Sequence, residues 1–154
     1  MKKRVSALLA VATLATLTLA GQAGAAPDTH TAADGARATT TVRIKATRIL
    51  EATAVLEHGQ SWSSDTATLV MQTDGNLVVY DEFGRARWNT GTVGQGWRAV
   101  FQTDGNFVVY TRSGKAVWNS KTAGHPGSRL AVQDDGNVVI YDGSQAIWNT
   151  RTAH

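Results

Sequence analysis

The stretch that decides the fold occurs three times, as MQTDGNLVVY at residues 71–80, FQTDGNFVVY at 101–110 and VQDDGNVVIY at 132–141. A tryptophan follows each copy, within RWNT, VWNS or IWNT. The third copy has one residue more before its Gln and one fewer between its Tyr and its Trp. Since loops tolerate such length changes, the sequence predicts loops between each Trp and the next Gln and between each Tyr and its Trp.

Each copy is predicted to form a β-hairpin, because apolar β-formers flank an Asp-Gly pair. A three-residue loop that ends with Gly75 in the left-handed conformation pairs Gln72 with Asn76. Val70 then faces Val78. Side chains alternate along a strand, so the motif separates into a polar face and a core face. The polar face of the first copy carries Gln72, Asn76, Val78 and Tyr80. The predicted core residues of the three copies are Met71, Leu77, Val79, Phe101, Phe107, Val109, Val132, Val138 and Ile140.

No helical period is visible in the repeated region. Hairpins at a spacing of about thirty residues predict an all-β fold with three similar sheets around a pseudo-threefold axis. One tryptophan from each repeat, Trp88, Trp118 and Trp148, is expected to fill the middle. The β-trefoil is the alternative architecture, since it also has three repeats and binds sugars, but its repeats are longer.

The N-terminus has the pattern of a secretory signal peptide at residues 1–25. Three basic residues (2–4) precede the apolar run Val5–Ala20, and the small residues Ala23-Gly24-Ala25 offer a cleavage site. Removal of this segment takes away three basic residues and leaves twelve basic against twelve acidic residues. A neutral protein has no long-range field for phosphate backbones, so no nucleic-acid partner is expected. The apolar run is too short for a membrane span, and we expect a secreted, extracellular protein without membrane insertion.

The rest of the chain divides into a leader and one domain. Residues 26–48 are rich in Ala and Thr and poor in large apolar side chains, which predicts a flexible leader, or alternatively a short pro-segment. Residues 49–154 are predicted to be the ordered domain with the three repeats. The chain contains no cysteine, so packing alone must stabilise it.

Comparison of the three copies separates packing positions from a candidate site. The core positions change freely among apolar residues. Turn chemistry explains the repeated Asp and Gly, but it does not explain why Gln and Tyr are also kept. We therefore predict a binding site in each repeat. The candidate residues are Gln72, Asp74, Asn76, Val78 and Tyr80, then Gln102, Asp104, Asn106, Val108 and Tyr110, and finally Gln133, Asp135, Asn137, Val139 and Tyr141.

The chemistry of these residues favours a neutral sugar as the ligand. A carboxylate, two amides and a phenol donate and accept hydrogen bonds, which suits vicinal hydroxyl groups beside a C–H face. A phosphate site would need Arg, Lys or free backbone amides. A metal site would need several carboxylates or histidines, whereas each copy repeats only one Asp. No metal and no other cofactor is therefore expected.

The motif Gln-x-Asp-x-Asn-x-Val-x-Tyr, present three times, resembles that of the bulb-type monocot mannose-binding lectins, also called the GNA-related lectins. The resemblance covers residues 49–154 and implies the β-prism II fold, with three four-stranded antiparallel sheets, and metal-independent recognition of mannose. It implies that Asp74 and Asn76 hold the sugar's O2. It also implies that Gln72 holds O3 and Tyr80 holds O4, while Val78 touches the ring carbons. The matching residues of the other two copies would have the same roles.

Two features bear on this resemblance. Plant members of the family usually carry a disulfide between the first two repeats, at positions that are here Gly75 and Trp97. Trp97 has no counterpart in the other copies, so it is either a local plug or an exposed aromatic beside a site. Members also pair by exchanging the C-terminal strand, here roughly residues 146–150, so a homodimer formed in this way is possible.

The remaining conspicuous residues are given ordinary roles. Trp62 lies where the first sheet should begin and is expected to be structural. Asp134 and Asp135 are neighbours whose side chains point apart, so they do not form an acid–base pair. Three histidines share no motif and no evident partner, and they are predicted to be surface residues. They are His58, His125 and His154.

Together these features predict a secreted lectin, not an enzyme, with three sites for mannose or a similar sugar on a glycan or polysaccharide. Three weak sites on one body raise the avidity for a branched or dense glycan. One alternative is an antibacterial protein resembling the lectin-like bacteriocins, which docks on a competitor's surface glycans. Another is a structural or inhibitory protein on the same fold with silent sites. An enzyme is disfavoured, because no catalytic constellation recurs.

Overall fold

The computed structural model describes residues 46–154. The predicted signal peptide (1–25) and residues 26–45 of the predicted leader lie outside the described residues. In the described part of the chain no helix is long and apolar enough to span a membrane. The strands are β1 (Arg48–Glu51), β2 (Ala54–Glu57), β3 (Ser61–Ser63), β4 (Ala67–Met71), β5 (Leu77–Asp81), β6 (Ala86–Asn89), β7 (Arg98–Phe101), β8 (Phe107–Tyr110), β9 (Ala116–Asn119), β10 (Arg129–Val132), β11 (Val138–Asp142) and β12 (Gln145–Asn149).

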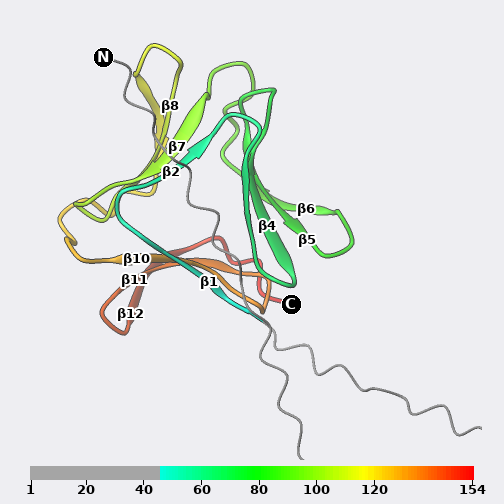
Figure 1. Cartoon of the computed structure of the whole chain (residues 1–154), viewed down its shortest axis with the longest axis vertical. Helices are drawn as coiled ribbons and strands as arrows, with labels where there is room; N and C mark the ends of the chain where they lie inside the picture. Colours follow the sequence, from blue (N-terminus) through cyan, green and yellow to red (C-terminus); the bar gives the residue numbers. More distant parts are fainter. Residues whose placement is uncertain (1–45) are drawn as a thin grey trace, which may run out of the picture. The chain divides into compact units, whose positions relative to one another are not determined.

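The strands form three four-stranded antiparallel sheets, one for each repeat (Figure 1). Their strand orders are β3-β4-β5-β6, β2-β7-β8-β9 and β1-β10-β11-β12. In each sheet a meander of three consecutive strands carries the repeated motif and ends on the strand that contains the tryptophan. The prediction of three similar sheets in an all-β fold is confirmed.

The hairpin between β4 and β5 has the predicted three-residue loop. The Gln72 amide donates to the Asn76 carbonyl over 2.9 Å, and the Gly75 amide donates to the Gln72 carbonyl over 3.1 Å. Gly75 has a φ of 90°, a left-handed conformation that glycine adopts without a steric penalty. Val70 faces Val78 in the register, as predicted. The other two copies repeat this turn, at Gly105 and Gly136.

The nine predicted core residues are all buried. Each is at most 1% exposed, and together with Leu56, Leu69 and Leu130 they form the hydrophobic core between the sheets. The three repeated tryptophans meet edge to face with ring centroids 5.5, 5.6 and 5.8 Å apart, a favourable geometry for aromatic pairs. They come from β6, β9 and β12, so one tryptophan from each sheet fills the middle, as predicted.

The fourth strand of each sheet comes from one continuous segment ahead of the repeats. β1 pairs with β10, β2 with β7 and β3 with β4. Residues 48–63 therefore contribute one edge to every sheet and connect all three. Trp62 lies in β3 and is 6% exposed, and its ring packs at 6.3 Å from that of Phe107. Its predicted structural role is confirmed.

The one-residue length changes lie in loops. The turn between β8 and β9 spans residues 111–115, whereas the turn between β11 and β12 spans only residues 143–144. The connection between β6 and β7 spans residues 90–97, and the one between β9 and β10 spans residues 120–128. At the C-terminal end, β12 pairs with β11 of the same chain, so the described chain completes all three sheets by itself.

Candidate functional site

The structure brings the five motif residues of each copy together on one hairpin. Gln72 follows β4, Asp74 lies in the turn, and Asn76 precedes β5, which contains Val78 and Tyr80. The Gln72 Nε2 donates to the Tyr80 hydroxyl over 2.6 Å, across the two strands. The same bond measures 2.6 Å in the second copy and 2.9 Å in the third. The first and last residues of each motif therefore contact each other on the face opposite the core.

The aspartate of each motif shapes the turn with one oxygen. Asp74 Oδ1 accepts a hydrogen bond from the Asn76 amide over 2.9 Å, and the corresponding distance is also 2.9 Å in the other two copies. The second oxygen, Oδ2, has no hydrogen-bond partner among residues 46–154. It stays available as an acceptor on the exposed turn.

The asparagine of each motif is held in one orientation by two donors to its amide oxygen. Asn76 Oδ1 accepts from the Thr90 hydroxyl over 3.2 Å and from the Thr92 amide over 3.1 Å. The second and third copies reproduce both bonds at 3.0 to 3.2 Å. Since the oxygen is engaged, the Nδ2 group is left with two N–H donors that no other described residue uses.

Sequence reasoning missed the hydroxyl residues that hold this asparagine. The Thr92 hydroxyl is buried, donates to the Gly75 carbonyl over 2.8 Å and lies 2.8 Å from the Thr90 hydroxyl oxygen. Equivalent pairs stand behind the other two turns. The signal was the pattern Trp-Asn-Thr/Ser-x-Thr, which recurs at residues 88–92, 118–122 and 148–152.

The valine and the tyrosine complete the face. Val78 is 3% exposed, so it offers a small apolar floor and no projecting side chain. The strand that contains the motif tyrosine pairs with the next strand along the chain, β5 with β6, β8 with β9 and β11 with β12. In each pair the register shifts by one residue next to that tyrosine. Such β-bulges redirect a side chain locally and are frequent beside binding sites. The Tyr80 hydroxyl accepts from Gln72 and keeps its own proton for a further partner.

The prediction that the three histidines lack partners is wrong. His58 Nε2 lies 2.9 Å from the Thr73 carbonyl oxygen, His125 Nδ1 lies 2.8 Å from Asp142, and His154 Nε2 lies 2.8 Å from Glu82. These partners are 15, 17 and 72 residues away along the chain, so only the fold brings them together. Among residues 46–154, no group of three or more His, Asp or Glu side chains is arranged to hold a metal ion.

Among residues 46–154, three titrating groups have shifted pKa values, and all lie outside the motif faces. The Thr152 carbonyl and the Glu82 carboxylate raise the pKa of His154, and the bond from His154 lowers the pKa of Glu82. Burial by itself raises the pKa of Asp81. Hydrogen bonds from the Arg85 and Phe83 amides and from the Arg85 guanidinium outweigh this effect, so that the Asp81 pKa lies below its ordinary value.

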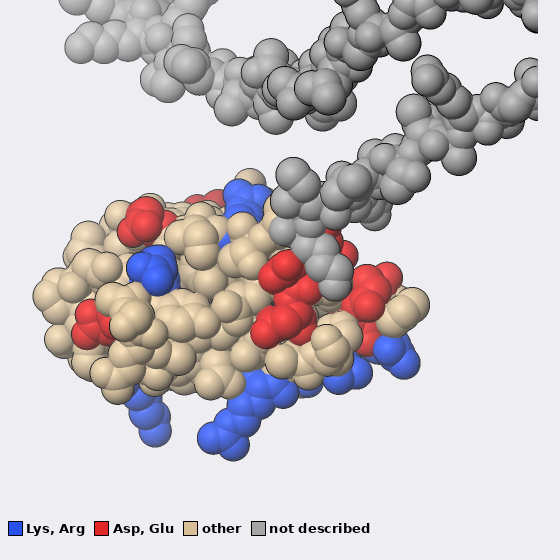
Figure 2. Space-filling model, turned by 90° about the horizontal axis from the view of Figure 1, so that it is seen from below, with Lys and Arg blue, Asp and Glu red and all other residues tan. Residues whose placement is uncertain are grey.

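The neighbouring carboxylates Asp134 and Asp135 engage different partners, as predicted. Asp134 Oδ1 accepts from the Thr47 hydroxyl over 3.1 Å, whereas Asp135 Oδ1 accepts from the Asn137 amide over 2.9 Å. Figure 2 shows a face of the domain that is mostly uncharged, with acidic side chains gathered on one side.

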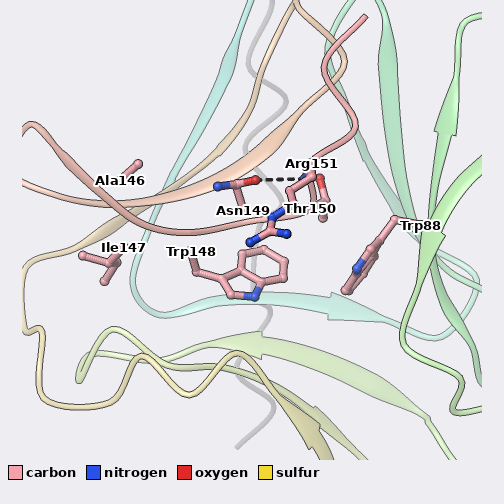
Figure 3. Close-up of a pocket in the computed structure, with 7 residues that line it drawn as sticks. All are labelled: Trp88, Ala146, Ile147, Trp148, Asn149, Thr150 and Arg151. Atoms are coloured by element: carbon pink, nitrogen blue, oxygen red, sulfur yellow. Dashed lines mark hydrogen bonds between the residues drawn. The ribbon is translucent and has the colours of Figure 1, made fainter.

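A hollow of about 510 Å³ lies beside the tryptophan cluster and outside the three motif faces. Figure 3 shows that Trp88 bounds it on one side, while Trp148 and its neighbours on β12 bound it on the other. The Asn149 side chain accepts from the Arg151 amide over 2.9 Å and fixes the end of this strand. No predicted site residue lines this hollow.

A threefold arrangement of β-sheets, each with an identical polar face, defines a class of carbohydrate-binding β-prism proteins. Among solved structures, a monomeric monocot mannose-binding lectin from Gastrodia elata is 40% identical, with a TM-score of 0.62, over 68% of this chain and 96% of the other. The mannose-specific agglutinin of snowdrop (Galanthus nivalis), solved with methyl α-D-mannoside, is 38% identical, with a TM-score of 0.57, over 69% and 97%. The lectin of Polygonatum cyrtonema, solved with a monomannoside, is 34% identical, with a TM-score of 0.56, over 67% and 94%.

The chain belongs to the monocot mannose-binding lectin family, with the β-prism II fold. No protein-family model matches the chain, and comparison with curated proteins gives no match. The family consists of lectins and not of enzymes, which agrees with the expectation from the sequence.

Proposed function

We propose that this protein is a lectin that binds mannose or a mannose-like sugar at three sites, one on each sheet, without a metal ion. The observation that carries the proposal is the arrangement around each motif asparagine. Two donors behind the sheet occupy its amide oxygen, so its N–H groups stay free next to the free oxygen of the motif aspartate. A donor and an acceptor held side by side match a sugar hydroxyl, which also donates and accepts.

The rest of each face supports the same ligand. The Gln72 Oε1 is a free acceptor within the described residues, and the Tyr80 hydroxyl is a free donor. Val78 supplies an apolar contact for ring carbons. The homologous lectins of snowdrop and Polygonatum cyrtonema were solved with mannosides, which supports mannose over other neutral sugars.

Three sites on one body support a multivalent target. A single shallow polar site binds weakly, because each hydrogen bond to the sugar replaces one to water. Effective concentration raises the avidity when a branched or dense glycan engages two or three sites together. The proposed target is therefore a mannose-rich glycan or polysaccharide.

Binding to immobilised mannan tests the proposal, with a triple variant that changes only the free N–H groups. The three substitutions are Asn76→Asp, Asn106→Asp and Asn137→Asp. Each keeps the side-chain oxygen that accepts hydrogen bonds from the hydroxyl residues behind the turn, and each replaces the NH₂ group with a second oxygen. We expect the wild type to bind in the presence of EDTA and to elute with methyl α-mannoside. The triple variant should bind at least about tenfold more weakly, since it loses a donor at every site.

A second triple variant controls for the added negative charge. Gln60→Glu, Ser113→Asp and Gln145→Glu also add three charges, at exposed positions outside the motifs. This control should bind as the wild type does. Full binding by the asparagine variant, loss of wild-type binding in EDTA, or equal losses in both variants would contradict the proposal.

We also propose that the protein is secreted, since residues 1–25 have the pattern of a signal peptide. N-terminal sequencing of protein from the culture medium should begin at Ala26.

Strand exchange between two copies stays a prediction. Sedimentation experiments on the mature chain test it: strand exchange requires a dimer, and a monomer would contradict it.

A further inference from the structure

The first site differs from the other two in what packs behind its turn glycine. A side-chain atom added at Gly136 would collide with the His154 ring, and one added at Gly105 would collide with the backbone of His125. Both histidines are paired with carboxylates, Glu82 and Asp142. At the first site the corresponding neighbour is Gly96, which has no side chain.

A hollow of about 260 Å³ occupies this position beside the first site. Asp74 of the motif lines it together with Thr73, Gly96, Trp97 and Arg112. Its volume is slightly below the roughly 300 Å³ at which pockets for drug-sized ligands begin, so it suits a single small polar unit. Asp74 thus belongs both to the first motif and to the lining of the hollow.

Three stacked side chains form one wall of this hollow. The rings of His58 and Trp97 are stacked with centroids 4.2 Å apart and an angle of 15° between their planes. The Arg112 guanidinium carbon lies 4.9 Å from the centre of the Trp97 ring. His58 and Arg112 thus both pack on the Trp97 ring. Trp97 itself is half-buried and lines the hollow beside the first site.

The stack is anchored to the first site and to the second sheet. His58 Nε2 hydrogen-bonds to the Thr73 carbonyl in the turn, and the Trp97 amide donates to the Tyr110 carbonyl over 2.7 Å. Arg112 itself forms no ion pair with any acidic side chain of residues 46–154. A guanidinium that packs on an aromatic ring can still bind a carboxylate or phosphate in bidentate fashion through its N–H groups.

We propose that the first site is extended by a subsite for an anionic sugar unit, bearing a carboxylate or a phosphate, next to the sugar held by the motif. This inference rests on the proposed function, because it assigns a second unit of the same glycan. Arg112 binds the anionic group, and Trp97 is a positioning residue for Arg112. At the third site the His154 ring, paired with Glu82, fills the corresponding space, and the second site has Ser128 in place of Trp97.

Calorimetry with matched disaccharides tests the subsite. The probes are α-mannosyl disaccharides joined through O2, O3 or O4 of a second residue that is glucose, glucuronate or glucose 6-phosphate. Asn106→Asp and Asn137→Asp, made in the full chain, restrict the measurement to the first site. In at least one linkage we expect an anionic disaccharide to bind about tenfold more tightly than its glucose counterpart. The preference should shrink as salt is added, and the two anions distinguish a carboxylate from a phosphate subsite.

Two substitutions separate a specific contact from general attraction. Arg112→Gln should abolish the preference, whereas Lys115→Gln should keep it, since it removes the same charge from an exposed position in the same turn. Trp97→Leu keeps the charge but removes the platform, and it should reduce the preference. Equal affinity for the neutral and anionic disaccharides in every linkage would overturn the subsite, and so would a preference that survives Arg112→Gln or disappears with Lys115→Gln.

The proposed function and the subsite can fail separately. If methyl α-mannoside does not bind, the proposed function is overturned. In that case the NMR signal of the Trp97 indole N–H decides on the subsite, which is overturned if neither glucuronate nor glucose 6-phosphate shifts this signal. If the mannoside binds and no anionic preference exists, only the subsite is overturned.

Discussion

The motif asparagines receive their orientation from residues that do not touch the face on which they act. Behind Asn137, the Thr150 hydroxyl donates to the amide oxygen over 3.0 Å and accepts from the Val138 amide over 3.0 Å. It also hydrogen-bonds to Thr152 at 2.8 Å, and all of this lies in the buried part of the sheet. An amide held from behind in this way offers its N–H groups to a ligand without first losing rotational freedom.

Replacement of Thr150 with valine should therefore weaken both the fold and the third site. Thr150→Val removes the hydroxyl but keeps the shape, so the Val138 amide and Asn137 each lose a partner. We expect a loss of about 1 to 3 kcal/mol in the free energy of unfolding, measured by urea denaturation, and weaker mannoside binding at the third site. Thr150→Ser is the matched control, since the second repeat has Ser120 at the same position, and it should stay within about 1 kcal/mol of the wild type. Equal losses in both variants would contradict a role for the hydroxyl.

Repetition made the residues of the candidate site predictable, and its limits are visible at particular residues. Gln133, Asn137 and Tyr141 could be predicted because they stay identical while their apolar neighbours change. The hydroxyl residues behind the turns were overlooked, because threonine is common and Ser120 interrupts the identity. The partner of His154 is 72 residues away, a contact that no local pattern encodes.

At the scale of elements, the turn glycines combine a backbone requirement with a packing requirement, and two of them allow these to be separated. Gly105 and Gly114 have nearly the same φ, 87° and 91°. A side-chain atom at Gly105 would collide with the His125 carbonyl oxygen, whereas one at Gly114 would meet nothing within 4 Å. Gly114→Ala should thus cost only the left-handed conformation, about 1 to 2 kcal/mol.

Gly105→Ala should cost about 1 to 3 kcal/mol more than Gly114→Ala, because it also forces the segment around His125 away from the turn. Thermal unfolding of the two variants measures the difference. The same displacement should weaken mannoside binding at the second site, since Asp104 in this turn accepts a backbone hydrogen bond from the His125 amide. Equal stability of the two variants would show that the close approach behind the turn has no energetic weight.

The central hairpins could be predicted from the sequence, whereas the outer strands could not. A loop of three residues determines which side chains share a face, so the register of β4 with β5 follows from the position of Gly75. β1, β2 and β3 are four, four and three residues long and carry no repeated pattern. Only the resemblance to known lectins implied a fourth strand in each sheet, and only the structure shows that one continuous segment supplies all three.

At the scale of the whole molecule, packing between sheets takes the place of covalent links. The tryptophans of β6, β9 and β12 each touch the other two, so each sheet contacts both of its neighbours at the centre. The segment that contains β1 to β3 joins the opposite edges of the sheets. This double connection holds the three sites in a constant arrangement, which is the condition for multivalent binding to one glycan.

The contact between His154 and Glu82 also joins two repeats, and it makes stability depend on pH. His154 Nδ1 lies 2.9 Å from the Thr152 carbonyl oxygen and Nε2 lies 2.8 Å from the Glu82 carboxylate. Both partners accept hydrogen bonds, so the two contacts favour the ring with protons on both nitrogens, which is positively charged. These contacts raise the His154 pKa from its ordinary value of 6.5, although Arg87 opposes the charge, and they lower the Glu82 pKa from 4.5.

The pair should therefore stabilise the fold most between about pH 4.5 and pH 6.5. The contribution of His154 is complete below 6.5 and is lost as the pH rises through its raised pKa. The contribution of Glu82 is complete above 4.5 and is lost as the pH falls through its lowered pKa. The free energy of unfolding, measured by urea denaturation from pH 4 to pH 9, should thus exceed that of His154→Gln most clearly near pH 5.5, and the two curves should approach each other above the His154 pKa. Curves that stay parallel over the whole range would show that the histidine packs over Gly136 without carrying a charge.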